Sequence, residues 1–229
     1  MQNFSSEEIK KLEQYLWVKE KPGKDEIILW EKVAAYSGYF SKIPGVLCIC
    51  VGNSLAMNAA HKDSDIDLFI ITKKNRIWTV RILMTLMLML LRQRKTSTQH
   101  AWKFCLSFFI TERALDFSTI KIKNDIYMHY WIKTLKPIIN RDHSFENFLW
   151  VNLSASYKHE KSILPRNHTF LTKLWDVCEK VIQLFLLPKT KKSFQNLWKP
   201  FWVIISDDML KFHDQDRRKE IRDSLVAKK

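Results

Sequence analysis

Two short apolar runs, joined by a polar turn, constrain the fold of this chain most strongly. The first run, Val46–Val51, reads VLCICV, and the second, residues 65–72, reads DIDLFIIT. Apolar runs of this length between polar breaks indicate buried β-strands rather than helices. Gly52 ends the first run, and the residues after it predict a short helix over about residues 54–61. The sequence therefore predicts two strands of one sheet with a compact connection between them.

The second run begins with two acids that share one face. Successive side chains of a strand point to opposite faces, so Asp65, Asp67 and Phe69 lie on one face and the aliphatic residues between them lie on the other. Carboxylates at positions i and i+2 are about 7 Å apart along the chain. Such a pair forms an all-oxygen pocket that suits Mg²⁺ or Mn²⁺, and the cation in turn binds a triphosphate. Taken alone, the two acids are also consistent with a polar strand entry that has no ligand.

The turn before these acids carries a second signal. Gly52 is small enough for a phosphate to approach the backbone, and Asn53 and Ser54 bring polar side chains and backbone N–H groups to the start of a helix. Gly52, Asn53 and Ser54 are therefore the predicted phosphate-binding residues of a nucleotide site.

A glycine-containing turn, about ten residues, and then Asp-x-Asp within an apolar strand resembles the polymerase-beta-like nucleotidyltransferase superfamily over about residues 46–72. The resemblance implies an α+β fold in which helices flank a small mixed sheet. It implies that Asp65 and Asp67 are catalytic residues that bind Mg²⁺, and that a nucleoside monophosphate passes from an NTP such as ATP to an acceptor hydroxyl. The acceptor is left open between a small molecule, an RNA 3′ end and a protein side chain.

Two departures from that pattern leave turnover open. Asn53 stands where the family has glycine or serine, and the predicted third strand, residues 104–110, lacks the third carboxylate that active members commonly carry on a neighbouring strand. Glu112, just past that strand, is the candidate catalytic base, and Asp116 lies further along. The alternative for Glu112 is a surface acid in a turn. Without a base the chain would be a catalytically degenerate module that binds nucleotide or RNA.

Binding of a triphosphate also needs positive charge beside the acids. Lys73, directly after the second strand, and Arg81, inside an apolar segment, are the candidate nucleotide-binding cations. The alternative for Lys73 is a solvated turn. For Arg81 it is a structural salt bridge, because an arginine among apolar residues needs an anionic partner.

The rest of the chain reads as mainly helical. We predict N-terminal helices over residues 1–44, a nucleotidyltransferase core over 45–123 and a mainly helical C-terminal region over 124–229. Pro165 and Pro188 are expected to separate helices, and a charged final helix begins near Asp214 or Asp216, whose acids suit a helix N-terminus better than a metal site. The further predicted elements are helices over about residues 6–20, 25–40, 77–91, 125–135, 145–161 and 169–187, and a small hairpin over 203–206 and 209–212.

Charge and cysteine content bear on the binding partners and the cellular compartment of the protein. A net charge of +14 is consistent with nucleotide, nucleic-acid or anionic membrane partners, and equally with solubility alone. The four cysteines form no zinc pattern and are predicted to be buried free thiols in a reducing compartment; they are Cys48, Cys50, Cys105 and Cys178. The N-terminus lacks a signal-peptide pattern, so we predict a cytoplasmic protein. The apolar segment 77–91 is shorter than the roughly 20 residues of a membrane span and is expected to be a core helix, with peripheral membrane association as the weaker alternative.

Overall fold

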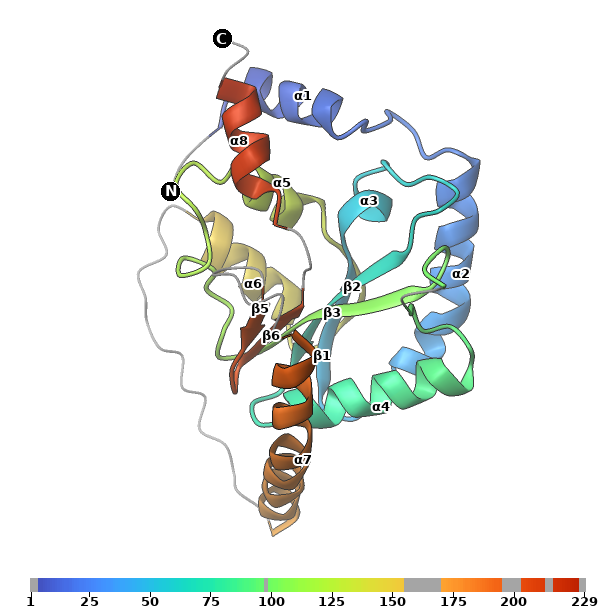
Figure 1. Cartoon of the computed structure of the whole chain (residues 1–229), viewed down its shortest axis with the longest axis vertical. Helices are drawn as coiled ribbons and strands as arrows, with labels where there is room; N and C mark the ends of the chain where they lie inside the picture. Colours follow the sequence, from blue (N-terminus) through green and yellow to red (C-terminus); the bar gives the residue numbers. More distant parts are fainter. Residues whose placement is uncertain (1–3, 97–98, 155–169, 195–202, 213–215, 227–229) are drawn as a thin grey trace.

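The computed structural model describes residues 4–96, 99–154, 170–194, 203–212 and 216–226. A six-stranded mixed sheet forms the centre, and helices pack on both of its faces (Figure 1). The prediction of a mixed sheet flanked by helices is confirmed in this general form.

The sheet has the strand order β4-β1-β2-β3-β6-β5. Strands β2 and β3 run parallel, and the other neighbouring pairs are antiparallel. The connection between the two parallel strands is the helix α4, as a crossover between parallel strands requires. The strands are β1 Val46–Val51, β2 Ile66–Thr72, β3 Phe104–Thr111, β4 Lys136–Asn140, β5 Val203–Ile205 and β6 Met209–Phe212.

Three of these strands follow residue 124, in the region predicted as mainly helical. The hairpin β5–β6 is confirmed, and it joins the central sheet by pairing β6 with β3. The strand β4 is absent from the sequence prediction because Lys136 and Pro137 interrupt its apolar pattern. Pro137 is tolerated because β4 is an edge strand, where a missing N–H donor costs no hydrogen bond on the outer side.

Eight helices occur in the part of the chain that the structure describes. Ser5 caps the first through a capping box with Glu8, whose carboxylate accepts from the Ser5 N–H at 2.9 Å. Two predictions are corrected: α3 is shorter than the predicted 54–61, and α7 continues through Pro188. The predicted helix over 145–161 corresponds to α6, and its residues 155–161 lie outside the described residues. The helices are α1 Ser6–Tyr15, α2 Lys24–Phe40, α3 Asn53–Ala56, α4 Ile77–Leu90, α5 Ile126–Thr134, α6 Ser144–Leu153, α7 Phe170–Phe194 and α8 Arg218–Val226.

The two faces of the sheet bury two separate apolar clusters. Helices α2, α4 and α7 contribute to the cluster on one face, and α1, α5, α6 and α8 contribute to the cluster on the other. The alternation of β2 is as predicted, because Ile66, Leu68 and Ile70 lie in the first cluster and Phe69 lies in the second. Asp67 therefore points toward the α5 side of the sheet.

The apolar segment that forms α4 is part of the core. Its residues Ile77, Trp78, Val80, Met84 and Leu88 are all at most 1% exposed. Among the described residues, no helix combines the length and the apolar character needed to cross a membrane.

Candidate metal and nucleotide site

Three chain segments meet at one edge of the sheet. β1 ends at the same edge at which β2 begins, because the two strands are antiparallel and Val51 pairs with Leu68. β3 also begins there, because it runs parallel to β2 and Cys105 is the register neighbour of Asp67. The turn after β1, the acids of β2 and the start of β3 are therefore adjacent in space.

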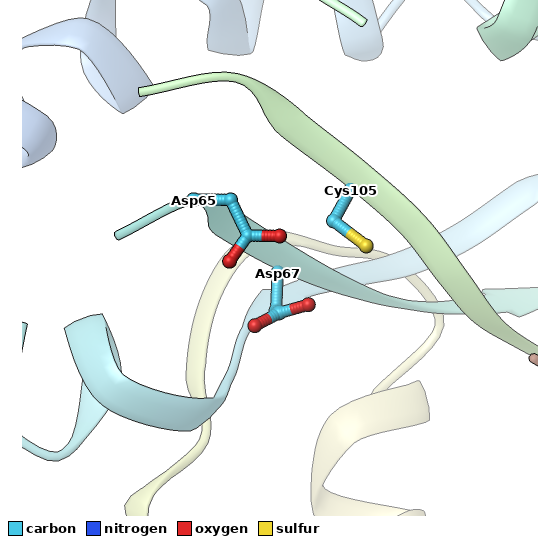
Figure 2. A group of neighbouring side chains, drawn as sticks. All are labelled: Asp65, Asp67 and Cys105. Atoms are coloured by element: carbon cyan, nitrogen blue, oxygen red, sulfur yellow. The ribbon is translucent and has the colours of Figure 1, made fainter. Parts of the chain in front are cut away.

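Asp65, Asp67 and Cys105 form a cluster at this edge, and Figure 2 shows their side chains close together, from the residue before β2, from β2 and from β3. One carboxylate oxygen of each acid and the Cys105 sulfur lie within 4.8 Å of one another, and all three side chains are partly buried. Within the residues that the structure describes, no other group of three such ligands is this close. Two carboxylates and a thiol are a chemically suitable donor set for a divalent cation.

Asn53 holds the Asp67 carboxylate in place. Its side-chain amide donates to Asp67 Oδ2 at 2.8 Å, and its side-chain carbonyl accepts from Trp131 Nε1 at 2.8 Å. The Gly52 N–H also donates to the main-chain carbonyl of Asp67 at 3.0 Å. The Asn53 side chain thus positions the Asp67 carboxylate, which is a different role from the phosphate contact that we predicted.

Gly52 has a packing role that the sequence does not reveal. A Cβ atom at this position would lie 3.2 Å from Trp131 Nε1 and 3.3 Å from a methyl group of Leu135. The space that we assigned to a phosphate is therefore used by the α5 indole ring. Ser54 is the second residue of α3, which begins at Asn53 with Gly52 as its N-cap residue.

Lys95 is the cation nearest to the two acids in the described structure. Its Nζ lies 2.7 Å from Asp65 Oδ2. The backbone places it there, because Arg94 forms a bridge with Phe104 and the Lys95 N–H donates to the Phe104 carbonyl at 2.9 Å. The loop after α4 therefore runs alongside the start of β3, and Lys95 balances one of the two clustered charges.

Burial and mutual repulsion make ionisation of this cluster costly. Burial, followed by the negative charge of Asp65, raises the pKa of Asp67 to about 6, although the hydrogen bond from Asn53 acts in the opposite direction. Burial, followed by the charge of Asp67, raises the pKa of the Cys105 thiol above its ordinary value. The cluster holds more negative charge than its surroundings compensate, which is the electrostatic setting that a divalent cation relieves.

This arrangement predicts that Asp67→Asn stabilises the metal-free protein. The folded state binds the Asp67 proton more tightly than the unfolded state, whose carboxyl has a pKa near 3.8. Ionising Asp67 in the folded state therefore lowers the free energy of unfolding. This loss is absent below about pH 4, grows between about pH 4 and 6, and is complete above about pH 6. We expect the free energy of unfolding in EDTA to rise by up to about 3 kcal/mol in Asp67→Asn at pH 7.5.

Urea unfolding of the wild type and of Asp67→Asn at pH 4 and pH 7.5 measures this difference. The introduced side-chain amide keeps an oxygen that accepts from Asn53, so local packing is retained. Equal stability of the two proteins at both pH values would show that ionised Asp67 carries no such cost.

A cavity of about 240 Å³ lies beyond Asn53, and neither Asp65 nor Asp67 is among the residues that line it. Asn53, which donates to Asp67, and Trp131, which donates to Asn53, both line it. Typical small-molecule pockets measure about 300–1,000 Å³, so this cavity suits one part of a nucleotide, such as its base, better than the whole molecule. Its other lining groups include aromatic rings and charged side chains: Phe108, Tyr127, Lys211, Asp216 and Arg218.

The charged residues of the cavity wall form a structural network. Arg218, the first residue of α8, contacts Asp125 at 2.8 Å and Asp216 at 2.6 Å. Burial lowers the pKa of Lys211 to about 8, and its Nζ lies 3.8 Å from Asp216. Asp216 and Arg218 thus fix the start of α8 against α5, in line with the helix N-terminus interpretation; Asp214 and His213 lie outside the described residues.

Glu112, the predicted base, lies at the wrong end of the sheet. It directly follows Thr111, which pairs with Thr72 at the far end of β2. Thr72 is five positions beyond Asp67 in β2, so Glu112 lies roughly 17 Å from the cluster along the strands. Its carboxylate accepts from the Lys74 N–H at 2.9 Å, which is the turn role that we named as the alternative. Asp116, later in the same loop, is half-buried, and its carboxylate accepts from the Ser118 N–H at 2.7 Å.

Lys73 and Arg81 are also remote from the acids. Lys73 follows β2 at the Glu112 end, where its N–H donates to the Gly45 carbonyl at 2.8 Å. Arg81 stacks on Phe212 with its guanidinium carbon 4.1 Å from the ring centroid, within the α4 layer on the opposite face from Asp67. Neither predicted alternative for Arg81 is met among the described residues, because an aromatic ring rather than an acid faces the guanidinium.

The structure adds Lys95, Cys105 and Trp131 to the site. Cys105 lies on β3, the strand on which active nucleotidyltransferases would be expected to carry the third carboxylate. The parallel register of β2 and β3 makes it the neighbour of Asp67. The residue order of β3 alone does not give that register. Lys95 appears in the sequence as one of several basic residues after an apolar helix, and Trp131 as one of nine tryptophans, so neither carries a local signal.

Comparison of the chain with protein-family models, with curated proteins and with solved structures finds no match in any of the three.

Proposed function

We propose that this chain binds a nucleoside triphosphate through a divalent cation held by Asp65 and Asp67, in a site of the nucleotidyltransferase type. The observation that carries the proposal is the convergence of both carboxylates with the turn after β1, next to a cavity with an aromatic lining. Two clustered carboxylates with too little compensating charge favour a cation, and an aromatic cavity beside them favours a planar group such as a nucleobase.

Each residue of the site has a defined task in this proposal. Asp67 is held by Asn53, which is itself held by Trp131, so one metal ligand is oriented before the ligand arrives. Lys95 neutralises Asp65 in the free protein. With a cation bound by Asp65 and Asp67, the Lys95 ammonium group would be available to pair with a phosphate of the nucleotide. A bound cation supplies charge neutralisation and orientation of the triphosphate.

The corresponding reaction is nucleotidyl transfer. An acceptor hydroxyl attacks the α-phosphorus in line, the bond to the β-phosphate oxygen breaks, and pyrophosphate leaves. The attacking hydroxyl must lose its proton, and within the described residues no further carboxylate joins Asp65 and Asp67.

Cys105 favours a second candidate function, which is binding without turnover. A protonated thiol is a poor substitute for a carboxylate as base, and burial keeps this thiol protonated. In this candidate the chain is a degenerate module that binds nucleotide, or RNA through its basic surface. Both candidates share the cation and nucleotide site and differ in the release of pyrophosphate.

Calorimetric titration with ATP, GTP, CTP and UTP tests the shared part. We expect at least one nucleotide to bind about tenfold or more tightly with Mg²⁺ or Mn²⁺ than in EDTA, because the cation links the carboxylates to the phosphates. Equal affinity in EDTA would contradict the proposal. Pyrophosphate release in the presence of hydroxyl acceptors separates the candidates, and a steep decrease of RNA affinity with salt concentration would identify RNA as the ligand of the second.

A further inference from the structure

We propose that Cys105 is the third ligand of this cation site, and that the site therefore takes a thiophilic divalent cation, such as Zn²⁺, in preference to Mg²⁺. The inference rests on the proposed cation site and names the class of cation that it binds. It follows from the placement and chemistry of a residue that the sequence pattern treats as an ordinary strand position.

The geometry of the three groups allows a shared cation. In a tetrahedral shell, ligand atoms bonded to one cation at about 2.0–2.3 Å are roughly 3.3–3.8 Å apart. The Cys105 sulfur and one oxygen each of Asp65 and Asp67 are already within 4.8 Å of one another. Side-chain rotations that bring the ligand atoms about 1 Å closer are therefore sufficient. The pairing of β2 with β3 fixes the Cα positions of Asp67 and Cys105, and Asp65 directly precedes the first paired residue, Ile66.

The donor chemistry distinguishes the possible cations. Mg²⁺ demands an octahedral shell of oxygen atoms and retains several waters, so a sulfur in its shell is unfavourable. Zn²⁺ accepts thiolate, imidazole and carboxylate ligands in a tetrahedral shell. Two carboxylates and one thiolate occupy three positions and leave the fourth for water or a phosphate oxygen. On binding, the thiol gives its proton to solvent and the sulfur–metal bond forms.

The remaining cysteines do not offer this combination. Cys48 and Cys50 are buried on β1 with their sulfur atoms 3.5 Å apart, and Cys178 is exposed on α7. None of them belongs to a group of three ligands within the part of the chain that the structure describes. They serve as internal controls because they are thiols without clustered carboxylates.

Titration with Co²⁺ tests the inference, because a cobalt–thiolate bond gives a charge-transfer absorption in the near ultraviolet that oxygen ligands do not. We expect this band in the wild type and in Cys178→Ser, saturating at one Co²⁺ per chain and disappearing when Zn²⁺ is added. We expect Cys105→Ser to lack the band. The preference for Zn²⁺ over Mg²⁺, measured by competition, should fall about tenfold or more in that variant.

Four outcomes would overturn the inference. A band of full intensity in Cys105→Ser would assign the sulfur to another cysteine, and an unchanged Zn²⁺ preference in a folded Cys105→Ser or Cys105→Ala would remove Cys105 from the shell. Binding of Mg²⁺ and nucleotide by the wild type without any cobalt band would overturn this inference alone and leave the proposed function standing. Absence of binding by every cation would overturn both.

Discussion

Asp65→Ala is expected to lower the affinity for a nucleoside triphosphate by about 100-fold or more when a divalent cation is present. The substitution removes one of the two carboxylates of the cluster and also releases Lys95, whose ammonium lies 2.7 Å from Asp65. The freed ammonium can then pair with Asp67, so the remaining carboxylate is both weaker as a ligand and partly neutralised. The loss should therefore exceed that of a simple ligand deletion.

Titration of nucleotide in Mg²⁺, Mn²⁺ and Zn²⁺ measures the effect, and the same titration in EDTA gives the cation-independent part. Glu112→Gln is the matched control, because it neutralises an acid of the same sheet roughly 17 Å from the cluster along the strands. We expect the control to bind like the wild type. Normal nucleotide binding by Asp65→Ala would contradict the assignment of Asp65 to the cation site. Loss of affinity in Glu112→Gln instead would place the site at the Glu112 end of the sheet.

The part of the site that lies on one continuous segment was predictable from the sequence. Strand alternation placed Asp65, Asp67 and Phe69 on one face, and the β1 and β2 boundaries agree with the structure to within one residue. Local patterns are sufficient here because the side-chain period of a strand and the breaking effect of Gly52 act over a few residues.

The part of the site that depends on strand register was not predictable. The relation of Cys105 to Asp67 requires the parallel pairing of β2 with β3, which are separated by the whole of α4. The same uncertainty explains the incorrect placement of Glu112, because closeness to a strand in sequence does not say at which end of the sheet a residue lies. In a parallel pair, residues after both strands meet at one end, and Asp67 is at the other.

Arg81 and Gly52 show a third limit of the sequence argument. An arginine in an apolar helix was expected to require an acid, but the ring of Phe212, from a strand more than a hundred residues later, faces the guanidinium. The glycine after β1 was expected to admit a phosphate, but the indole of Trp131 lies against it. At Gly52 the residue type predicts a close neighbour but not which one, and at Arg81 an aromatic ring takes the place of the expected anion. In both positions tertiary packing decides which group lies beside the residue.

Cys105→Asp is expected to convert the cluster into three carboxylates and to raise pyrophosphate release from a nucleoside triphosphate by about 100-fold or more. Position 105 is the register neighbour of Asp67, so a carboxylate there lies beside both existing acids. It provides the proton acceptor that the described residues do not otherwise place at the cluster. The substitution also replaces a sulfur ligand with a carboxylate oxygen, so the cation preference of the site should shift from Zn²⁺ toward Mg²⁺.

Pyrophosphate release is measured in Mg²⁺ with water, glycerol and a short RNA as acceptors. Cys105→Asn is the matched control because asparagine has the shape of aspartate without its charge, and we expect it to remain at the wild-type rate. A third clustered carboxylate should also lower the melting temperature in EDTA, and Mg²⁺ should restore it, which verifies that the new acid reaches the cation. If the two variants release pyrophosphate at equal rates although Mg²⁺ restores the melting temperature of Cys105→Asp, the lack of a base at position 105 does not limit nucleotidyl transfer. The binding function would then be the better description of the site.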